Sequence, residues 1–292
     1  MIRANCSIVI ICGLLIAHTT AQPDIPPALA AMADTERSFA QTATQKGWRD
    51  AFLDFFADDA IAFAPEVISA KARLRKQPSR PFSELELVWE PRTGDVAASG
   101  ELGWLTGPST SIDHTKPDAK PRHGCYLSVW RKQPDGKWRV FIDVGANSPE
   151  PVTFATGFTR MPVSSRYAGK DGKESASKSL ADADRDMNAQ IASQGIPLAF
   201  ANRVGPAARL HRPGNIPLVG PDAIASWLKT NATAGTATHT AAEAANSGDI
   251  GYTYGRYELS APKPQAGVYV RLWSRDAAGR WWITADVAQP GS

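Results

Sequence analysis

The pattern of apolar and polar positions around residue 130 predicts a β-hairpin. Residues 124–131 and 136–144 are rich in aromatic and β-branched side chains, and residues 132–135 between them include a proline and an aspartate. Two such runs joined by a short polar segment are typical of two antiparallel strands and their turn. Residues 267–273 and 279–287 repeat the same pattern near the C-terminus.

The two hairpins belong to a module that the chain contains twice. Three landmarks recur 143 positions later, namely Trp130 with Trp273, Trp138 with Trp281, and Asp143 with Asp286. Upstream landmarks recur 148 positions later, among them Glu36 with Asp184, Phe52 with Phe200, and Gly107 with Gly255. Because the offset changes only once, in the loop 109–123, the repeat indicates tandem domains.

Helical periodicity precedes the strands in both copies. In residues 28–46 apolar side chains recur at roughly helical spacing, and Gly47 is a natural stop. Residues 48–57 predict a second helix. Residues 221–228, which begin with a proline, predict a helix in the second copy. Helices followed by a run of antiparallel strands predict an α+β fold.

These patterns divide the chain into a first domain at residues 22–148, a linker at 149–179 and a second domain at 180–292. The linker shows no periodicity, and its part 167–178 is rich in Gly, Ser and Lys, which is typical of a flexible connection. Residues 152–161 are more apolar, so we expect them to pack along a module.

Residues 1–21 have the features of a secretory signal peptide. Arg3 is followed by an apolar centre at 8–17 and by small residues at 19–21, ahead of Gln22. The apolar run is too short for a membrane anchor, and no later segment could span a bilayer. We therefore expect a periplasmic or secreted protein without membrane association after cleavage. Only Cys125 would then remain, which excludes an intramolecular disulfide.

Charge and motifs exclude several function classes. The formal net charge of +3 gives no electrostatic case for a nucleic-acid partner. The five histidines show no metal-ligand spacing, and no phosphate loop or dinucleotide fingerprint occurs. The sequence therefore predicts no metal and no cofactor.

The order of these elements resembles the nuclear transport factor 2-like superfamily, closest to its SnoaL-like and ketosteroid-isomerase-like branches. The residues that carry the resemblance are 57–60 with Pro65 in the first copy and 209–213 with 219–224 in the second, together with both hairpins and their terminal aspartates. The resemblance implies two tandem cone-shaped domains. In each, a curved antiparallel sheet would wrap around two or three N-terminal helices and leave an apolar pocket.

The sequence offers large rings that could line such pockets and favour a small apolar or aromatic ligand. The candidates on predicted strands are Trp104, Tyr126, Trp130, Tyr252, Tyr254, Tyr269 and Trp273. Plain core packing is the alternative for each ring.

Glu36 and Asp184 each precede an arginine on the first helix of their copy. Adjacent residues on a helix do not face each other, and a surface position is the default expectation for such charges. The alternative is that the carboxylate points into the mouth of the cone as a polar anchor for a ligand.

The SnoaL-like resemblance implies Asp143 and Asp286 as catalytic acid/base residues. Strand alternation leaves this open, because it places Asp143 with Arg139 on the face opposite to Trp138 and Ile142. If that apolar face turns inward, Asp143 is a solvated or interface residue.

Ketosteroid-isomerase chemistry is not expected. The resemblance implies a carboxylate base directly before the proline of each copy, where this chain has Ala64 and Arg212. A methyl group cannot accept a proton, and an arginine stays protonated.

Two functions remain open at this stage. The first is a non-catalytic protein that binds a small apolar molecule. The second is a lyase, cyclase or hydrolase that uses Asp143, Asp286 or both. Because the resemblance implies dimerisation through the outer sheet face, we also expect the two modules to pair as an intramolecular pseudo-dimer.

Overall fold

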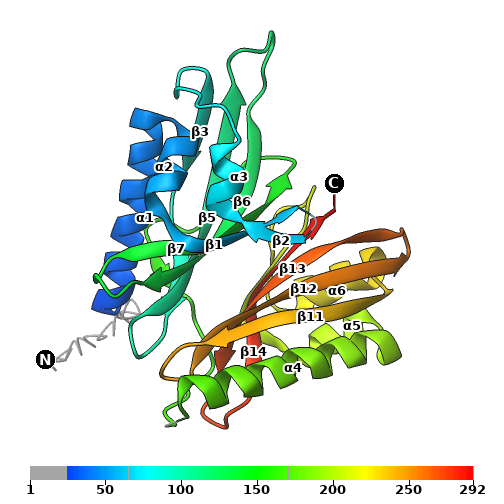
Figure 1. Cartoon of the computed structure of the whole chain (residues 1–292). Helices are drawn as coiled ribbons and strands as arrows, with labels where there is room; N and C mark the ends of the chain where they lie inside the picture. Colours follow the sequence, from blue (N-terminus) through cyan, green and yellow to red (C-terminus); the bar gives the residue numbers. More distant parts are fainter. Residues whose placement is uncertain (1–24, 65, 170, 292) are drawn as a thin grey trace, which may run out of the picture.

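The computed structural model describes residues 25–291 apart from residues 65 and 170 (Figure 1). The predicted signal peptide, residues 1–21, lies outside the described residues and stays a prediction. Pro65, which helps to carry the resemblance, lies outside them too. Among the described helices, none has the length and apolar character needed to cross a membrane.

The first unit consists of three helices and a sheet. Its elements are α1 (Pro27–Lys46), α2 (Trp48–Phe55), β1 (Phe56–Ala64), β2 (Glu66–Ser69), α3 (Ala70–Arg75), β3 (Leu85–Trp89), β4 (Thr93–Val96), β5 (Leu102–Asp113), β6 (Arg122–Lys132) and β7 (Trp138–Ser148). The short β8 (Thr159–Arg160) completes a sheet of order β2-β1-β7-β6-β5-β4-β8, and β3 pairs with β5. The pairs β1–β7 and β4–β8 are parallel, and the others are antiparallel.

The second unit repeats this plan. Its elements are α4 (Lys173–Gln194), α5 (Ile196–Ala201), β9 (Val204–His211), β10 (Leu218–Val219), α6 (Pro221–Asn231), β11 (Ala234–Ala244), β12 (Ile250–Ala261), β13 (Gln265–Arg275) and β14 (Trp281–Pro290). The strand order is β10-β9-β14-β13-β12-β11. The predicted fold class is confirmed, because each of two tandem α+β units combines helices with one mainly antiparallel sheet, although α3 and α6 follow the first two strands of their units (Figure 1).

Local sequence explains how α1 is bounded and oriented. Pro27 occupies its first turn, where a missing N–H costs nothing. The helix ends at Gly47, whose φ is +85° and where a Cβ would lie 2.2 Å from the carbonyl oxygen of Arg80. Only glycine meets both conditions. The predicted apolar face is buried, with Met32 and Phe39 fully covered.

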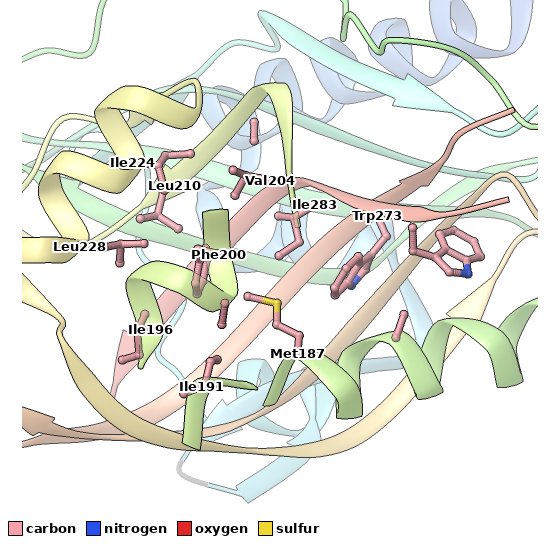
Figure 2. Packing of buried hydrophobic residues seen from close by; sticks show 14 of the residues in the cluster. Met187, Ile191, Ile196, Phe200, Val204, Leu210, Ile224, Leu228, Trp273 and Ile283 are labelled. Atoms are coloured by element: carbon pink, nitrogen blue, oxygen red, sulfur yellow. The ribbon is translucent and has the colours of Figure 1, made fainter. Parts of the chain in front are cut away.

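Each unit has its own apolar core between its helices and its sheet. In the first unit Phe39 of α1 packs against Trp130 of β6 and Val140 of β7. In the second unit Met187 of α4 and Phe200 of α5 pack against strand residues that include Trp273 (Figure 2).

A third apolar cluster is shared by the two sheets. The first unit contributes Leu127 and Val129 of β6, and the second contributes Val270 and Leu272 of β13. All four side chains are at most 1% exposed. The outer faces of both sheets are therefore buried against each other.

A β-bulge lets the last strand of each unit face two cores. In the first unit Trp130 pairs with Val140 and Val129 pairs with Ile142, so Phe141 is the extra residue. An extra residue reverses the alternation of the side chains that follow. Val140 accordingly packs in the first unit's own core, whereas Ile142 packs in the shared cluster.

The second unit has the same bulge. Trp273 pairs with Ile283 and Leu272 pairs with Ala285, which leaves Thr284 as the extra residue.

The bulge at Phe141 shows that the expectation of a common face for Trp138 and Ile142 is wrong. Unbroken alternation does not apply across a bulge.

The predicted linker is shorter and better anchored than its composition indicates. Helix α4 begins at Lys173, inside the range 149–179. The apolar part of the linker, residues 152–161, packs as expected, because its Met161 is buried. The guanidinium groups of Arg160 and Arg166 lie 2.7 and 2.8 Å from the fully buried Asp95 carboxylate, which ties the segment to β4.

Candidate functional site

A carboxyl group of α1 lies at the centre of the first unit. Glu36 is fully buried and accepts hydrogen bonds from Trp89 Nε1 (2.6 Å), Ser128 Oγ (2.8 Å) and Trp130 Nε1 (2.9 Å). Burial raises the pKa of Glu36 from 4.5 to about 7, although the three hydrogen bonds oppose this shift. Glu36 therefore changes its charge near neutral pH.

Asp143 and Tyr126 face the same hollow of about 300 Å³, whose lining also includes Trp89. Within the described residues, the buried Tyr126 hydroxyl has no hydrogen-bond partner. Burial and the negative charge of Glu36 raise the pKa of Asp143 well above its usual value. Burial, together with the same charge, also raises the pKa of Tyr126. A carboxyl group with a raised pKa and a phenol thus face one cavity, and the protonated forms of both are hydrogen-bond donors.

Asp184 takes the place of Glu36 in the second unit, but the guanidinium group of Arg271 lies beside it. Arg271 Nη1 lies 2.7 Å from Asp184 Oδ1, while His239 Nδ1 and Tyr269 Oη lie 2.7 Å from Oδ2. Burial alone would raise the pKa of Asp184, but the charge of Arg271 and these hydrogen bonds outweigh it and lower that pKa. Arg271 stands where the repeat has Ser128 in the first unit.

Asp286 is held between two guanidinium groups. Arg271 Nε donates to its Oδ2 at 3.1 Å, and Arg212 Nη1 lies 2.6 Å from its Oδ1. The side chain is 1% exposed. Asp286 forms two ion pairs, whereas no ion pair of Asp143 is found among the described residues, so the two last-strand aspartates have different surroundings.

The second unit contains a hollow of about 330 Å³ with an apolar lining. Its apolar residues include Ile191, Ile196, Phe200, Trp227 and Leu228. Figure 2 shows four of these side chains, all except Trp227, gathered in the core of the second unit. The polar part of the wall includes Tyr269, Arg271 and Asp286 together with Arg212, Asn231, Thr236, Lys263 and Gln265.

The default surface position for the helix carboxylates is wrong. Glu36 and Asp184 are fully buried, whereas Arg37 and Arg185 are exposed and pair with aspartates three positions earlier. Neighbouring helix positions point in different directions, so one residue of each pair faces inward and the other outward. Both carboxylates therefore point inward, but neither is among the lining residues of the two hollows, so the role of a ligand anchor stays a prediction.

Four of the predicted lining rings lie inside the units. Tyr126 and Tyr269 line the two hollows. Trp130 and Trp273 are fully buried core residues whose indole N–H groups donate to Glu36 and to Thr253.

The other three rings lie between the sheets, away from both of these hollows. Trp104 and Tyr252 belong to the shared cluster, and Tyr254 packs against it with its ring 5.6 Å from that of Phe63. Their assignment as lining of a cone is wrong. Outer-face positions carry rings here because the other sheet covers them.

Four functional side chains escaped the sequence reasoning: Trp89, Ser128, His239 and Arg271. The repeat offset of 143 aligns Ser128 with Arg271, and that charge difference inside an apolar strand was the available signal. Trp89 and His239 lie on strands outside the repeated hairpin pattern, so no spacing singled them out.

Comparisons with known proteins concern the fold only. No family model matches the chain, and no curated protein matches it. Among solved structures, a ketosteroid isomerase-like protein from Erwinia carotovora atroseptica SCRI1043 is 16% identical, with 40% of this chain and 94% of that chain covered and a TM-score of 0.33.

Two further solved structures give similar values. An NTF-2 like protein of unknown function from Shewanella oneidensis MR-1 is 17% identical, covers 38% of this chain over 96% of its own, and has a TM-score of 0.31. A protein of unknown function with a cystatin-like fold from Nostoc punctiforme PCC 73102 is 12% identical, with coverages of 41% and 91% and a TM-score of 0.31. At these scores the likeness says nothing about activity.

Replacing Arg271 tests the buried charge network. We expect Arg271→Met to lower the free energy of unfolding by about 3 to 5 kcal/mol, because Asp184 and Asp286 would lose their shared cation. Urea unfolding at neutral pH measures the loss. The matched control is the exposed Arg185→Met, expected to change stability by less than about 1 kcal/mol. Equal effects of the two substitutions would contradict the network.

Glu36 should make stability depend on pH. The folded state keeps this proton up to about pH 7, whereas the unfolded chain releases it near pH 4.5, so the folded state binds more protons in between. Stability contributed by Glu36 is therefore lost as pH rises through this window, by about 3 kcal/mol. We expect Glu36→Gln to remove this slope in urea unfolding series, and the exposed Glu174→Gln to retain it. A slope unchanged in Glu36→Gln would refute the assignment.

Proposed function

We propose that this protein binds a small, largely apolar molecule in the hollow of the second unit. The observation that carries the proposal is a cavity of about 330 Å³ whose lining includes Phe200, Trp227 and Leu228. Small-molecule sites are typically concave, apolar and furnished with few polar groups, and their volumes begin near this size.

The polar wall of this hollow supports binding without catalysis. Arg271 Nε donates to Asp286, and Arg271 Nη1 donates to Asp184 and Asn188, so these two nitrogens are already engaged. Tyr269 donates to Asp184. These bonds hold the polar side chains in place, and the apolar residues of the lining supply the remaining contacts, which favours a largely apolar molecule.

The second candidate function is acid catalysis in the first unit. The observation that favours it is the pairing of Asp143 with Tyr126 on one hollow, with raised pKa values for both groups. A protonated carboxyl and a phenol can together donate to a carbonyl oxygen and stabilise the charge that develops on it. We therefore propose Asp143, and not Asp286, as the acid of the catalytic alternative.

We also propose that the two units work as an intramolecular pseudo-dimer. The shared cluster of Leu127, Val129, Val270 and Leu272 supports this pairing. It buries in one chain the kind of apolar sheet face that separate subunits would bury by association.

Filling the second hollow should abolish binding. Ala237 is half-buried and lines the cavity, so Ala237→Trp would occupy it. We expect the dissociation constant for the neutral fluorophore N-phenyl-1-naphthylamine to rise at least about tenfold, measured by fluorescence titration. Val219→Trp, at a position 46% exposed on β10, is the control and should bind as wild type. Equal binding by Ala237→Trp would refute the site.

Infrared spectroscopy tests the protonation of Asp143. At about pH 8, above the pKa of about 7 for Glu36, we expect wild type to show the carbonyl stretch of a protonated carboxylic acid. The band should disappear in Asp143→Asn and persist in Asp286→Asn, because Asp286 forms ion pairs with Arg212 and Arg271, whereas no ion pair of Asp143 is found among the described residues. Persistence in Asp143→Asn would exclude the acid-catalyst role.

A further inference from the structure

Two arginines in the wall of the second hollow keep unused hydrogen-bond donors. Arg271 uses Nε for Asp286 and Nη1 for Asp184, but its Nη2 forms no hydrogen bond with any described residue. Arg212 contacts Asp286 and the carbonyl oxygen of His211 through Nη1, and its Nε and Nη2 form no hydrogen bond within the same part of the chain. The side chains of Arg271 and Arg212 are only 3% and 14% exposed, and both line the hollow. Since buried donors in proteins normally have partners, these N–H groups indicate an acceptor inside the hollow.

The sheet holds the two guanidinium groups on either side of Asp286. Arg271 of β13 is the cross-strand partner of Asp286 of β14. On the other side, Asp286 pairs with Leu210 of β9, and Arg212 follows the last residue of that strand. The Arg271 guanidinium also lies over the ring of Tyr269, 3.9 Å from its centroid. Neighbouring strands and a stacked ring therefore hold these cations in place before a ligand binds.

The charges around the hollow do not balance. Its lining contains one carboxylate, that of Asp286, and three cations, Arg212, Lys263 and Arg271. Behind the wall, Asp184 pairs with Arg271 at 2.7 Å and adds a second carboxylate, whose lowered pKa keeps it ionised at neutral pH. Lys263 is exposed on the turn between β12 and β13, and no ion pair of its ammonium group is found among the described residues. Three cations against two carboxylates leave one positive charge, with the neighbouring His239 counted as neutral.

We infer that the ligand of the second hollow is an apolar monocarboxylic acid. Its carboxylate accepts hydrogen bonds from the free N–H groups of Arg271 and Arg212, and Lys263 adds its charge from the exposed turn. Its apolar part lies beside Phe200 and Leu228 (Figure 2). A guanidinium group suits a planar carboxylate, and one negative charge matches the single excess positive charge. The inference rests on the proposed binding function of the second hollow and adds the chemical class of its ligand.

Three straight-chain probes of equal carbon number test the charge of the ligand. Decanoate, decanamide and decylamine each displace N-phenyl-1-naphthylamine from the full mature chain at about pH 8, where the first is an anion, the second is neutral and the third is a cation. We expect wild type to bind decanoate at least about tenfold more tightly than decanamide, because hydrogen bonds between charged groups are the stronger ones. Decylamine should bind most weakly, since the excess positive charge repels it.

Two substitutions each remove one positive charge from the lining. We expect the preference for decanoate over decanamide to fall about twofold to fivefold in Lys263→Gln, whose side chain is exposed, and at least about tenfold in Arg212→Gln. Lys229→Gln is the control with the same charge change, at an exposed position of α6 outside the lining, and should keep the preference. Thermal unfolding verifies that every variant is folded, and Lys263→Gln decides the test if Arg212→Gln does not fold.

The outcomes separate this inference from the proposed function. Equal binding of decanoate and decanamide by wild type refutes the carboxylate site, and so does a preference that survives in every folded lining variant. In both cases the hollow still binds apolar molecules if Ala237→Trp weakens all three probes. If Ala237→Trp binds every probe as wild type does, the proposed function itself fails. A preference for decanoate that the lining substitutions reduce and Lys229→Gln retains supports the inference.

Discussion

The last strand of each unit must serve two cores, and a single extra residue makes this possible. Phe141 in the first unit and Thr284 in the second interrupt the pairing of the final hairpin. Before the bulge the apolar side chains of the strand pack under the helices, and after it they pack against the other sheet. The same reversal turns Asp143 and Asp286 towards the hollows. Sheet pairing and site geometry therefore depend on one local irregularity.

The two sites differ mainly in how they compensate buried carboxyl groups. In the first unit Glu36 has only neutral donors around it, and desolvation keeps a proton on the acidic groups up to higher pH. In the second unit Arg271 supplies a positive charge at the position of Ser128, and both carboxylates form ion pairs. Arg271 and Arg212, which stand at the positions of Ser128 and Ala64, thus distinguish the carboxyl groups of the second unit from those of the first.

The sequence was sufficient for the duplication and the α+β plan, because periodicity and a constant offset do not depend on tertiary contacts. Helix α1, from its first-turn proline to Gly47, follows directly from local signals. The faces of Asp143 and Trp104 could not be predicted in this way. A prediction that assumes unbroken alternation assigns residues beyond a bulge to the wrong face of the sheet. A ring on the outer face that a second sheet buries has the same sequence pattern as a ring that lines a pocket. Arg271 was overlooked because a charge within a strand usually indicates solvent.

Both sheets of the shared cluster lie in one polypeptide, and this frees the protein from the symmetry of a homodimer. When two identical subunits pair, every residue change occurs in both sites at once. Here the codon for Ser128 and the codon for Arg271 can diverge independently, while the pairing of the sheets stays at a fixed one-to-one ratio at any dilution. Because both units lie in one chain, the site of one unit can change while the pairing of the sheets and the site of the other unit stay as they are.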